Sequence, residues 1–201
     1  MKNVLLTSTG LEHKVVADKF LSIIPKNACE LKILFIPTAS RTEEEMFFVR
    51  KSLKELLSVG VNNDNVVWFD PDNLSTHRDN TEVDCIYVCG GNTFYLLHKL
   101  KESGYFDKIK QWVNDGLLYV GASAGSVIAT PDINYILCMD TNDCGLEDTS
   151  GLSFISQSII PHYTDEFAEA AESLENNGIT VETISDSEAL EVHGEEIVKV
   201  G

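Results

Sequence analysis

The chain has 201 residues, of which 43% are hydrophobic, and a formal net charge of −17. This length and apolar content fit a single well-buried domain over residues 1–201 and exclude a disordered chain, and no apolar run approaches the roughly 20 residues that span a bilayer. The negative charge argues against a protein that binds the nucleic-acid backbone.

Apolar strands alternate with amphipathic helices along the first 122 residues. Short runs rich in β-branched residues predict strands at 3–8, 32–39, 65–69, 85–90 and 117–122. Apolar residues at helical spacing predict helices at 11–24, 42–60, 92–104 and 105–116. In the second of these helices we expect Thr42 as N-cap, with Glu45 completing a capping box and Gly60 ending the helix.

The remaining residues continue the pattern with shorter elements. We expect a helix that starts near Ala124, a strand in "SIIP" (158–161), an acidic helix at about 165–176, and strands around 179–184, 189–193 and 196–200. Repeated β–α units with near-continuous apolar strands predict an α/β fold, with a mainly parallel sheet covered by helices on both faces. Sites in such folds lie beyond the carboxyl ends of the strands.

The five cysteines form no C-x-x-C pair, which argues against a zinc site. Cys85 and Cys89 flank "IYV" in an apolar segment, where cysteine usually serves as a small core residue. The first residues turn polar early and lack a small-residue cleavage pattern. Free thiols without a signal peptide favour a cytoplasmic protein.

Positive charge is confined almost entirely to the first half of the chain. From Gln111 to Gly201 the only lysine or arginine is Lys199. A substrate carboxylate bound by this half would need backbone amides, a helix N-terminus, or a cation supplied by the first half.

The stretch "GASAGS" (121–126) contains a G-x-S-x-G pattern directly after an apolar strand. In a nucleophile elbow, a sharp strand-to-helix turn exposes the serine, and the flanking glycines keep the neighbouring backbone clear. Gly121, Ser123 and Gly125 satisfy this pattern. The alternative is an ordinary glycine-rich loop that binds phosphate, although the G-K-[ST] ending of a P-loop is absent.

A nucleophilic serine needs a base, and five histidines are available. His162 follows the strand "SIIP" and precedes a helix, which predicts a position at the same sheet edge as Ser123. The positions of the other four histidines in the predicted elements do not indicate a catalytic role: His13, His77, His98 and His193. Acidic residues are too abundant for spacing to identify the orienting carboxylate.

Three segments in this order, "GGNTFYLLHKL", "VGASAGSVIATPDI" and "IIPHYTDE", resemble the peptidase E family of serine peptidases. That family includes the aspartyl dipeptidases and is related to the cyanophycinases. Its fold is similar to the class I glutamine amidotransferase domain, a three-layer sandwich. The resemblance extends over most of the chain and therefore implies one peptidase E-like catalytic domain.

The resemblance also implies roles for individual residues. Ser123 matches the family's nucleophile, and His162 matches the general base of its P-H-[FY]-T motif. The "GGN" segment implies an oxyanion-hole amide at Gly91, or at Asn92, together with the amide of Ala124.

The third member of the implied triad is a glutamate on a late strand or turn. Glu188 in "SDSEAL" falls in the matching place, and Asp186 is the neighbouring alternative.

The sequence departs from the aspartyl dipeptidases at two positions that matter for specificity. An aspartate that follows their serine by about fifteen residues corresponds, without gaps, to Cys138. The resemblance also implies an arginine after the histidine motif that binds the aspartyl carboxylate. This arginine is missing here, since the segment after "PHYT" is acidic and contains neither arginine nor lysine. We therefore do not expect strict specificity for N-terminal aspartate, and a substrate with a free amino group suits the acidic surface better.

The leading hypothesis is a serine-type hydrolase that cleaves small, dipeptide-like substrates without a metal or cofactor, acting as a monomer or homodimer. The alternative is a catalytically impaired module on the same fold that binds or senses a small molecule. A third possibility, an amidotransferase-type glutaminase, is disfavoured because that chemistry uses cysteine in place of Ser123.

Overall fold

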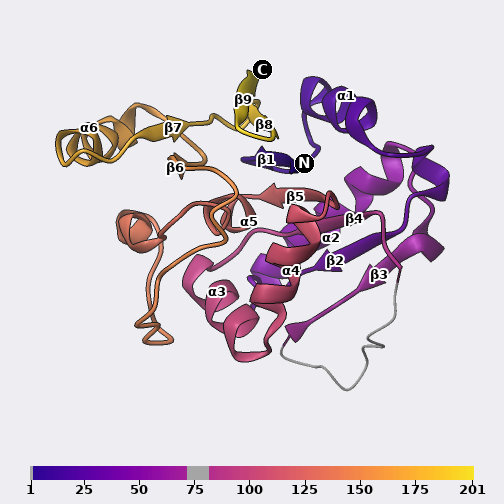
Figure 1. The fold of residues 1–201 in the computed structure, drawn as a ribbon, viewed down its shortest axis with the longest axis horizontal. Coiled ribbons are helices and arrows are strands. Elements are labelled where there is room, and N and C mark those ends of the chain that lie inside the picture. Colours follow the sequence, from indigo (N-terminus) through magenta and orange to yellow (C-terminus); the bar gives the residue numbers. More distant parts are fainter. Residues whose placement is uncertain (1, 72–81) are drawn as a thin grey trace.

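The computed structural model of the protein describes residues 2–71 and 82–201. Its main sheet has seven strands in the order β3–β2–β4–β5–β1–β8–β9 (Figure 1). The bounds of these strands are β1 Asn3–Thr7, β2 Ile33–Ile36, β3 Val66–Trp68, β4 Cys85–Val88, β5 Leu118–Ala122, β8 Ala189–His193 and β9 Glu196–Val200. β6 (Ser158–Ile160) and β7 (Val181–Thr183) form a separate two-stranded parallel sheet.

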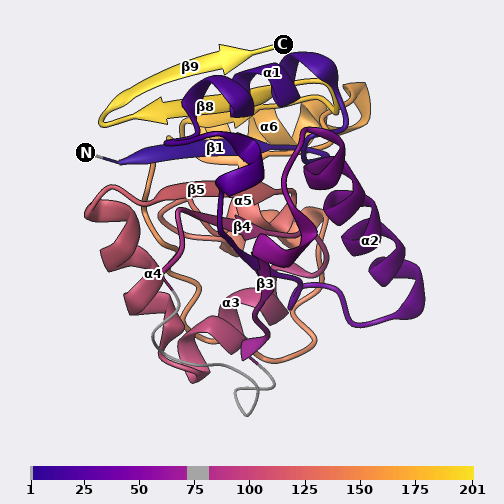
Figure 2. The same cartoon turned by 90° about the vertical axis from the view of Figure 1, so that its right-hand side faces the viewer.

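The main sheet is mainly parallel, as the alternation of strands and helices predicted. β3, β2, β4, β5 and β1 pair in parallel, whereas β8 is antiparallel to both β1 and β9. β8 and β9 are joined by only two residues, Gly194 and Glu195, and so short a connection permits only antiparallel strands. Figure 2 shows β9, β8, β1 and β5 lying one after another.

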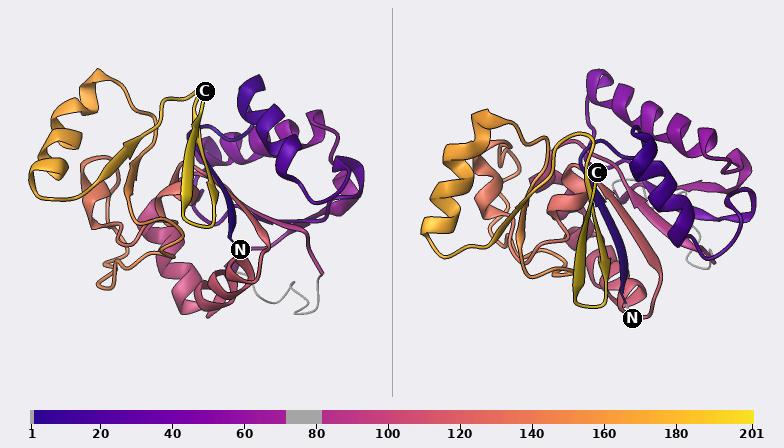
Figure 3. Two further views of the ribbon diagram at one scale, coloured as in Figure 1. Left: turned by 45° about the horizontal axis from the view of Figure 1, so that its top comes forward. Right: turned by 90° about the horizontal axis from the view of Figure 1, so that it is seen from above.

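Helices cover both faces of the sheet and produce three layers (Figure 3). α1 (Lys14–Ile23) and α2 (Glu43–Ser58) pack on one face. α3 (Thr93–Glu102), α4 (Tyr105–Asn114) and the short α5 (Ala124–Val127) pack on the other. α6 (Ala168–Asn176) lies beside β7, away from the main sheet. Short 3-10 helices span Ala28–Glu30, Asn63–Asn65, Asn134–Cys138 and Asp165–Phe167.

The central strands are buried on both faces, which explains their near-continuous apolar sequence. In β4, Ile86 and Val88 belong to the core beneath α3 and α4. Cys85, Tyr87 and the following Cys89 belong to the core beneath α1 and α2, because successive side chains of a strand point to opposite faces. Both cysteines are fully buried free thiols, so the prediction that they fill the core is confirmed.

The start of α2 has the capping box that the sequence predicted. The Thr42 hydroxyl accepts a hydrogen bond from the Glu45 amide at 3.2 Å, and the Glu45 carboxylate accepts one from the Thr42 amide at 2.8 Å. These bonds satisfy amides that have no partner within the helix. Gly60 follows the last turn with a φ of +100°, a conformation that suits glycine.

Two expectations about local structure need correction. The strand in "SIIP" forms, but as β6 it pairs with β7 in the small second sheet and does not join the main sheet. The predicted acidic helix at 165–176 begins as a 3-10 turn and becomes α-helical only at Ala168. Neither difference could be derived from periodicity, because strand pairing and helix type depend on tertiary contacts.

Within the part of the chain that the structure describes, no helix is both long enough and apolar enough to cross a membrane.

Glu55 of α2 is a partly buried carboxyl beneath the loop that follows β1. Its Oε2 accepts a hydrogen bond from the Leu11 amide at 2.9 Å, and its buried Oε1 has no hydrogen-bond partner among the described residues. Burial raises the pKa of Glu55 to about 7, although the Leu11 amide and the charge of Lys51 oppose this increase. The Glu12 carboxylate adds to the increase.

This raised pKa predicts that stability falls as the pH increases. Between about pH 4.5 and 7 the folded state holds a proton on Glu55 that the unfolded state has lost, so the free energy of unfolding decreases over this window. Glu55→Gln keeps an acceptor for the Leu11 amide and removes the titration. We expect denaturant unfolding of this variant to depend less on pH than that of the wild type. The exposed Glu172→Gln serves as control, and equal pH dependence in Glu55→Gln and wild type would contradict the assignment.

Candidate active site

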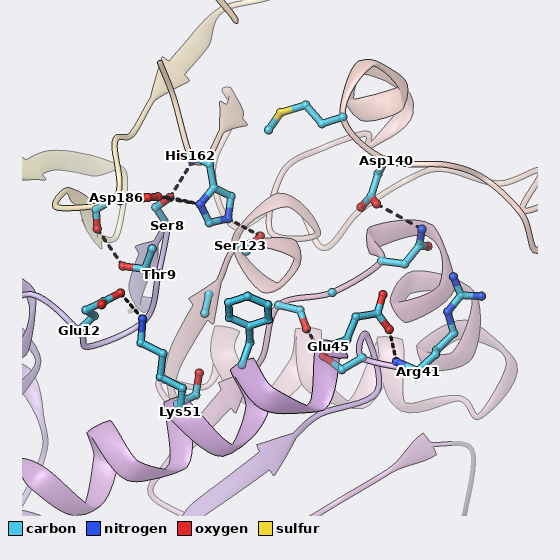
Figure 4. A pocket seen from close by; sticks show the side chains of 18 of the residues that line it. Ser8, Thr9, Glu12, Arg41, Glu45, Lys51, Ser123, Asp140, His162 and Asp186 are labelled. Atoms are coloured by element: carbon cyan, nitrogen blue, oxygen red, sulfur yellow. Dashed lines mark hydrogen bonds and ion pairs between the residues drawn. The ribbon is translucent and has the colours of Figure 1, made fainter. Parts of the chain in front are cut away.

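A cavity of about 750 Å³ opens at the edge of the sheet where β1, β4 and β5 end (Figure 4). Ser8 follows β1, Gly90 and Gly91 follow β4, and Ser123 follows β5, and all of them line this cavity. β1 pairs with β5, but the next strand in the sequence, β2, lies on the far side of both β5 and β4. The order of the strands in the sheet therefore changes direction here. Parallel α/β folds place their sites at such a switch point.

Ser123 lies on a strained turn between β5 and α5. Its φ of 51° and ψ of −111° are unusual for a residue with a side chain. The flanking glycines are required by close backbone packing. A Cβ on Gly121 would lie 2.5 Å from the Gly125 oxygen, and one on Gly125 would lie 2.4 Å from the Val88 oxygen. The G-x-S-x-G pattern therefore forms an elbow, as its setting between strand and helix predicted.

Hydrogen bonds from the end of β1 hold this turn in place. The Ser123 amide donates to the Thr7 oxygen at 3.0 Å, and the buried Ser126 hydroxyl contacts the oxygens of both Thr7 and Gly121. The Thr7 hydroxyl in turn donates to the Gly121 oxygen at 2.9 Å. Because these groups are buried and paired, the strained turn is fixed from both sides.

His162 connects Ser123 to Asp186 through its two ring nitrogens. Ser123 Oγ lies 2.9 Å from Nε2, and Asp186 Oδ1 lies 2.7 Å from Nδ1. An ionised carboxylate only accepts hydrogen bonds, so Nδ1 must carry the proton that this contact requires. In that tautomer Nε2 is left to accept the serine hydroxyl, which is the arrangement needed to activate a nucleophile.

Ser8 fixes the position of this histidine and of its carboxylate partner. The Ser8 hydroxyl accepts a hydrogen bond from the His162 amide at 2.7 Å and donates one to Asp186 Oδ1 at 3.0 Å. The Thr9 hydroxyl donates to the backbone oxygen of Asp186 at 2.8 Å. His162 has a φ of 54°, another strained value, and these contacts from the end of β1 stabilise it. No sequence pattern indicated this role for Ser8 or Thr9.

Asp186 is ionised in this arrangement. Partial burial acts to raise the pKa of its carboxyl, but the hydrogen bond and charge of His162 and the bond from Ser8 outweigh burial and lower the pKa below its usual value. A negative charge beside Nδ1 stabilises an imidazolium at His162.

Glu188, the residue preferred from the sequence, does not contact His162. Its carboxylate accepts a hydrogen bond from the Ser185 amide at 2.8 Å and lies 3.9 Å from Lys199 Nζ. The structure places the neighbouring alternative, Asp186, against the ring instead. The two acids belong to one tight turn, closed by the Glu188 amide and the Ser185 oxygen, so their side chains leave it in different directions.

Two backbone amides beside Ser123 are available to a ligand. The Gly91 amide has no acceptor among the described residues, and the Ala124 amide begins α5, where no preceding turn provides an acceptor. The Asn92 amide is already bonded to the Ala39 oxygen at 2.8 Å, which removes it as a donor. Gly91 has a φ of +135°, and a Cβ there would lie 2.3 Å from the Ala39 oxygen, so this position requires glycine.

The other histidines that the structure describes, and Cys138, do not line the cavity. His77 is outside the described residues, and His193 contacts Asn3 at 2.7 Å. His13 and His98 do not line the cavity. Cys138 ends an exposed 3-10 turn, whereas Asp140, two residues further on, does line the cavity. Matching the family's aspartate to this chain without gaps selects Cys138, so the match misses Asp140, which lies two residues further on.

The cavity also contains two cations from the first half of the chain. Lys51 Nζ is paired with the Glu12 carboxylate at 2.5 Å. The Arg41 guanidinium lies over the Tyr95 ring at 4.7 Å. The acidic helix α6 contributes no residue to the cavity lining. In residues 2–71 and 82–201, no group of three side chains is arranged to hold a metal ion.

Comparison with known proteins relates this geometry to a family of enzymes. The model of "Peptidase family S51" matches residues 4–200. The uncharacterized peptidase Lmo0363 of Listeria monocytogenes is 35% identical over 207 residues, covering 98% of both chains. Peptidase E of Escherichia coli is 31% identical over 174 residues, covering 84% of this chain and 72% of its own.

A solved structure supports the same relationship. The crystal structure of a candidate peptidase E protein from Listeria monocytogenes EGD-e superposes with a TM-score of 0.81 and 33% identity, covering 99% of this chain and 98% of its own.

The strain at Ser123 predicts an unusual effect on stability. Strained backbone at such a site lowers the free energy of unfolding by about 1–3 kcal/mol. Glycine relieves this strain, and the greater conformational entropy of its unfolded chain offsets only part of the gain in stability. We expect Ser123→Gly to be about 1 kcal/mol more stable than Ser123→Ala, since both variants lack the hydroxyl and only alanine keeps the Cβ. Denaturant unfolding measures the difference. An alanine variant as stable as the glycine variant would show that the turn is not strained.

Proposed function

The chain belongs to peptidase family S51 and is a serine peptidase of the peptidase E type, and from this premise we propose that Ser123, His162 and Asp186 are its catalytic triad. One observation carries the proposal: the unbroken contacts from Ser123 Oγ to His162 Nε2 and from Nδ1 to Asp186, at 2.9 and 2.7 Å. A His162 ring that faced away from Ser123, with no carboxylate behind it, would instead favour the alternative of a catalytically impaired module. The observed contacts favour catalysis.

The proposed reaction is a two-step acyl transfer. Ser123 Oγ attacks the carbonyl carbon of the scissile peptide bond while His162 Nε2 accepts the hydroxyl proton. The amides of Gly91 and Ala124 donate hydrogen bonds to the carbonyl oxygen as it becomes an oxyanion. His162 then gives its proton to the leaving amine and the C–N bond breaks. Water hydrolyses the acyl-enzyme by the same sequence of steps and restores the Ser123 hydroxyl.

We propose small peptides as substrates. The cavity volume of about 750 Å³ matches sites that enclose a small ligand rather than a folded protein. The segment after His162 lacks an arginine for a substrate carboxylate, which argues against strict specificity for N-terminal aspartate. Arg41 and Lys51 supply positive charge from the first half of the chain instead, so acidic substrates are not excluded.

Removal of the nucleophile tests the proposal directly. We expect Ser123→Ala to lower kcat for dipeptides and for a chromogenic ester by at least about 1,000-fold, because no other group replaces the attacking oxygen. A fluorophosphonate should label wild type at Ser123 and leave the variant unmodified. Circular dichroism serves as control for folding. Normal turnover by a folded alanine variant would refute the role of Ser123.

A matched pair of acidic variants tests the third member of the triad. Asp186→Asn removes the charge that holds the Nδ1 proton, and we expect kcat to fall by about 100- to 10,000-fold. Glu188→Gln, two residues away in the same turn, should keep kcat within about threefold because Glu188 does not reach the ring. A larger loss in Glu188→Gln than in Asp186→Asn would restore the assignment made from the sequence.

A further inference from the structure

The peptide bond between Gly90 and Gly91 carries one of the two amides proposed above as oxyanion donors. Both residues follow β4 and line the cavity. A Cβ added to Gly90 would lie 3.0 Å from Ser123 Cβ and 3.6 Å from Ser123 Oγ, so this peptide bond lies beside the nucleophile. A donor so close to the reacting atoms is effective only if its N–H group points at the developing charge. The orientation of this peptide plane therefore matters for the reaction.

The sequence of the loop does little to fix that orientation. Glycine has no Cβ, so a peptide bond between two glycines rotates about its flanking bonds at small cost. Half a turn would exchange its two polar groups, and the Gly90 oxygen would then face Ser123 in place of the Gly91 N–H. The partial negative charge of that oxygen would repel an oxyanion. Contacts from outside the loop must therefore hold the peptide plane.

Two hydrogen bonds from the segment after β2 hold the loop from one side. The Ser40 hydroxyl donates to the Gly90 oxygen at 2.9 Å, and the Asn92 amide donates to the Ala39 oxygen at 2.8 Å. The Ser40 amide donates to the Pro37 oxygen at 2.9 Å, so the backbone fixes the serine itself. The bond of Asn92 restrains the peptide bond after Gly91, and the bond of Ser40 restrains the peptide bond before it.

The strand order determines where the Gly91 amide then points. β4 lies between β2 and β5, and Ser40 follows β2 whereas Ser123 follows β5. The Gly90 oxygen is bonded to Ser40 and is therefore directed toward the β2 side. In a trans peptide bond the C=O and N–H groups point in opposite directions, and the described residues contain no cis peptide bond. The Gly91 N–H is thus directed toward the β5 side, where Ser123 lies.

We propose that Ser40 is a positioning residue of the oxyanion hole, whose hydroxyl holds the Gly90–Gly91 peptide bond so that the Gly91 N–H faces the carbonyl attacked by Ser123. The same hydrogen bond polarises the peptide bond and makes its N–H a stronger donor. This inference rests on the proposed function, because an oxyanion forms only if Ser123 attacks a carbonyl. Ser40 acts through the peptide bond, so its contribution is largest when the negative charge develops.

Ser40→Ala tests the proposal, since it removes the hydrogen bond without adding bulk. The substrate is p-nitrophenyl acetate, and kcat/KM reports on the acylation step. Complete loss of an oxyanion donor lowers the rate by about 100- to 1,000-fold, and here the donor is only released from its fixed orientation. We therefore expect kcat/KM to fall by about 10- to 100-fold. Ser40→Thr keeps the hydroxyl and should restore kcat/KM to within about threefold of wild type.

A second substrate provides a readout that a merely structural role would not change. In p-nitrophenyl thionoacetate, sulfur replaces the carbonyl oxygen and accepts hydrogen bonds poorly. Wild type should therefore prefer the oxygen ester, after correction for the rates of both esters with hydroxide. In Ser40→Ala we expect this preference to fall by about 10-fold, because the amide that distinguishes oxygen from sulfur is no longer held in place. If Ser40→Ala does not fold, Ser40→Cys, a weaker donor, is measured in the same way.

Two control variants remove a hydroxyl without releasing the loop. Ser58→Ala breaks a hydrogen bond of the same kind, from a serine hydroxyl to the Lys54 oxygen, at an exposed position outside the cavity lining. Thr141→Ala removes a hydroxyl from the cavity wall that contacts Asp143. Both variants should keep the wild-type rate and the wild-type preference for the oxygen ester.

Each remaining outcome decides against the proposal. An unchanged rate in Ser40→Ala, or an equal loss with the oxygen and the sulfur ester, would overturn it while leaving the triad intact. A loss in Ser40→Thr as large as that in Ser40→Ala would also overturn it, because the hydroxyl would not be the group that matters. Wild type that hydrolyses neither ester and is not labelled by a fluorophosphonate at Ser123 would refute the proposed function and this inference together.

Discussion

The hydrogen bonds between the end of β1 and the turn after β5 are the contacts on which the site depends. Thr7 and Ser126 are buried. The Thr7 hydroxyl donates to the backbone oxygen of Gly121, two residues before Ser123, and the Ser126 hydroxyl contacts the oxygens of both Thr7 and Gly121, so these bonds hold the strained turn against the end of β1. The next residue, Ser8, binds both His162 and Asp186. One parallel strand pair thus positions all three members of the proposed triad, although they are distant in sequence.

Much of this arrangement followed from the sequence, and the remainder depended on tertiary contacts. The α/β architecture, the capping box of α2 and the buried cysteines follow from local patterns, and the structure confirms them. The elbow at Ser123 has a local signal because its glycines are separated by a fixed spacing. The choice between Asp186 and Glu188 has no such signal, since only the path of the turn decides which carboxylate faces the ring. The positions of Ser8 and Asp140 in the cavity follow only from the tertiary structure, which brings the end of β1 and the segment after the 3-10 helix Asn134–Cys138 to the same cavity.

Although the protein is strongly acidic, its cavity contains both carboxylates and basic side chains. The second half of the chain supplies Asp140, His162 and Asp186 but no cation near the cavity, whereas α2 and the residues before it supply Arg41 and Lys51. The acidic helix α6, which belongs to the acidic segment after "PHYT", contributes no residue to the cavity lining. A free amino group and an acidic group are therefore both compatible with the cavity, on different parts of its wall.

The central claim is that Ser123 becomes acylated during the reaction, and trapping the intermediate tests it most directly. Rapid acid quenching of the protein with excess p-nitrophenyl acetate, followed by intact mass measurement and peptide mapping, reports whether and where the chain is acylated. The triad predicts a burst of p-nitrophenol together with one acetyl group on the peptide that contains Ser123. Steady turnover with an unmodified Ser123 peptide, or with the acetyl group at another residue, would contradict the account.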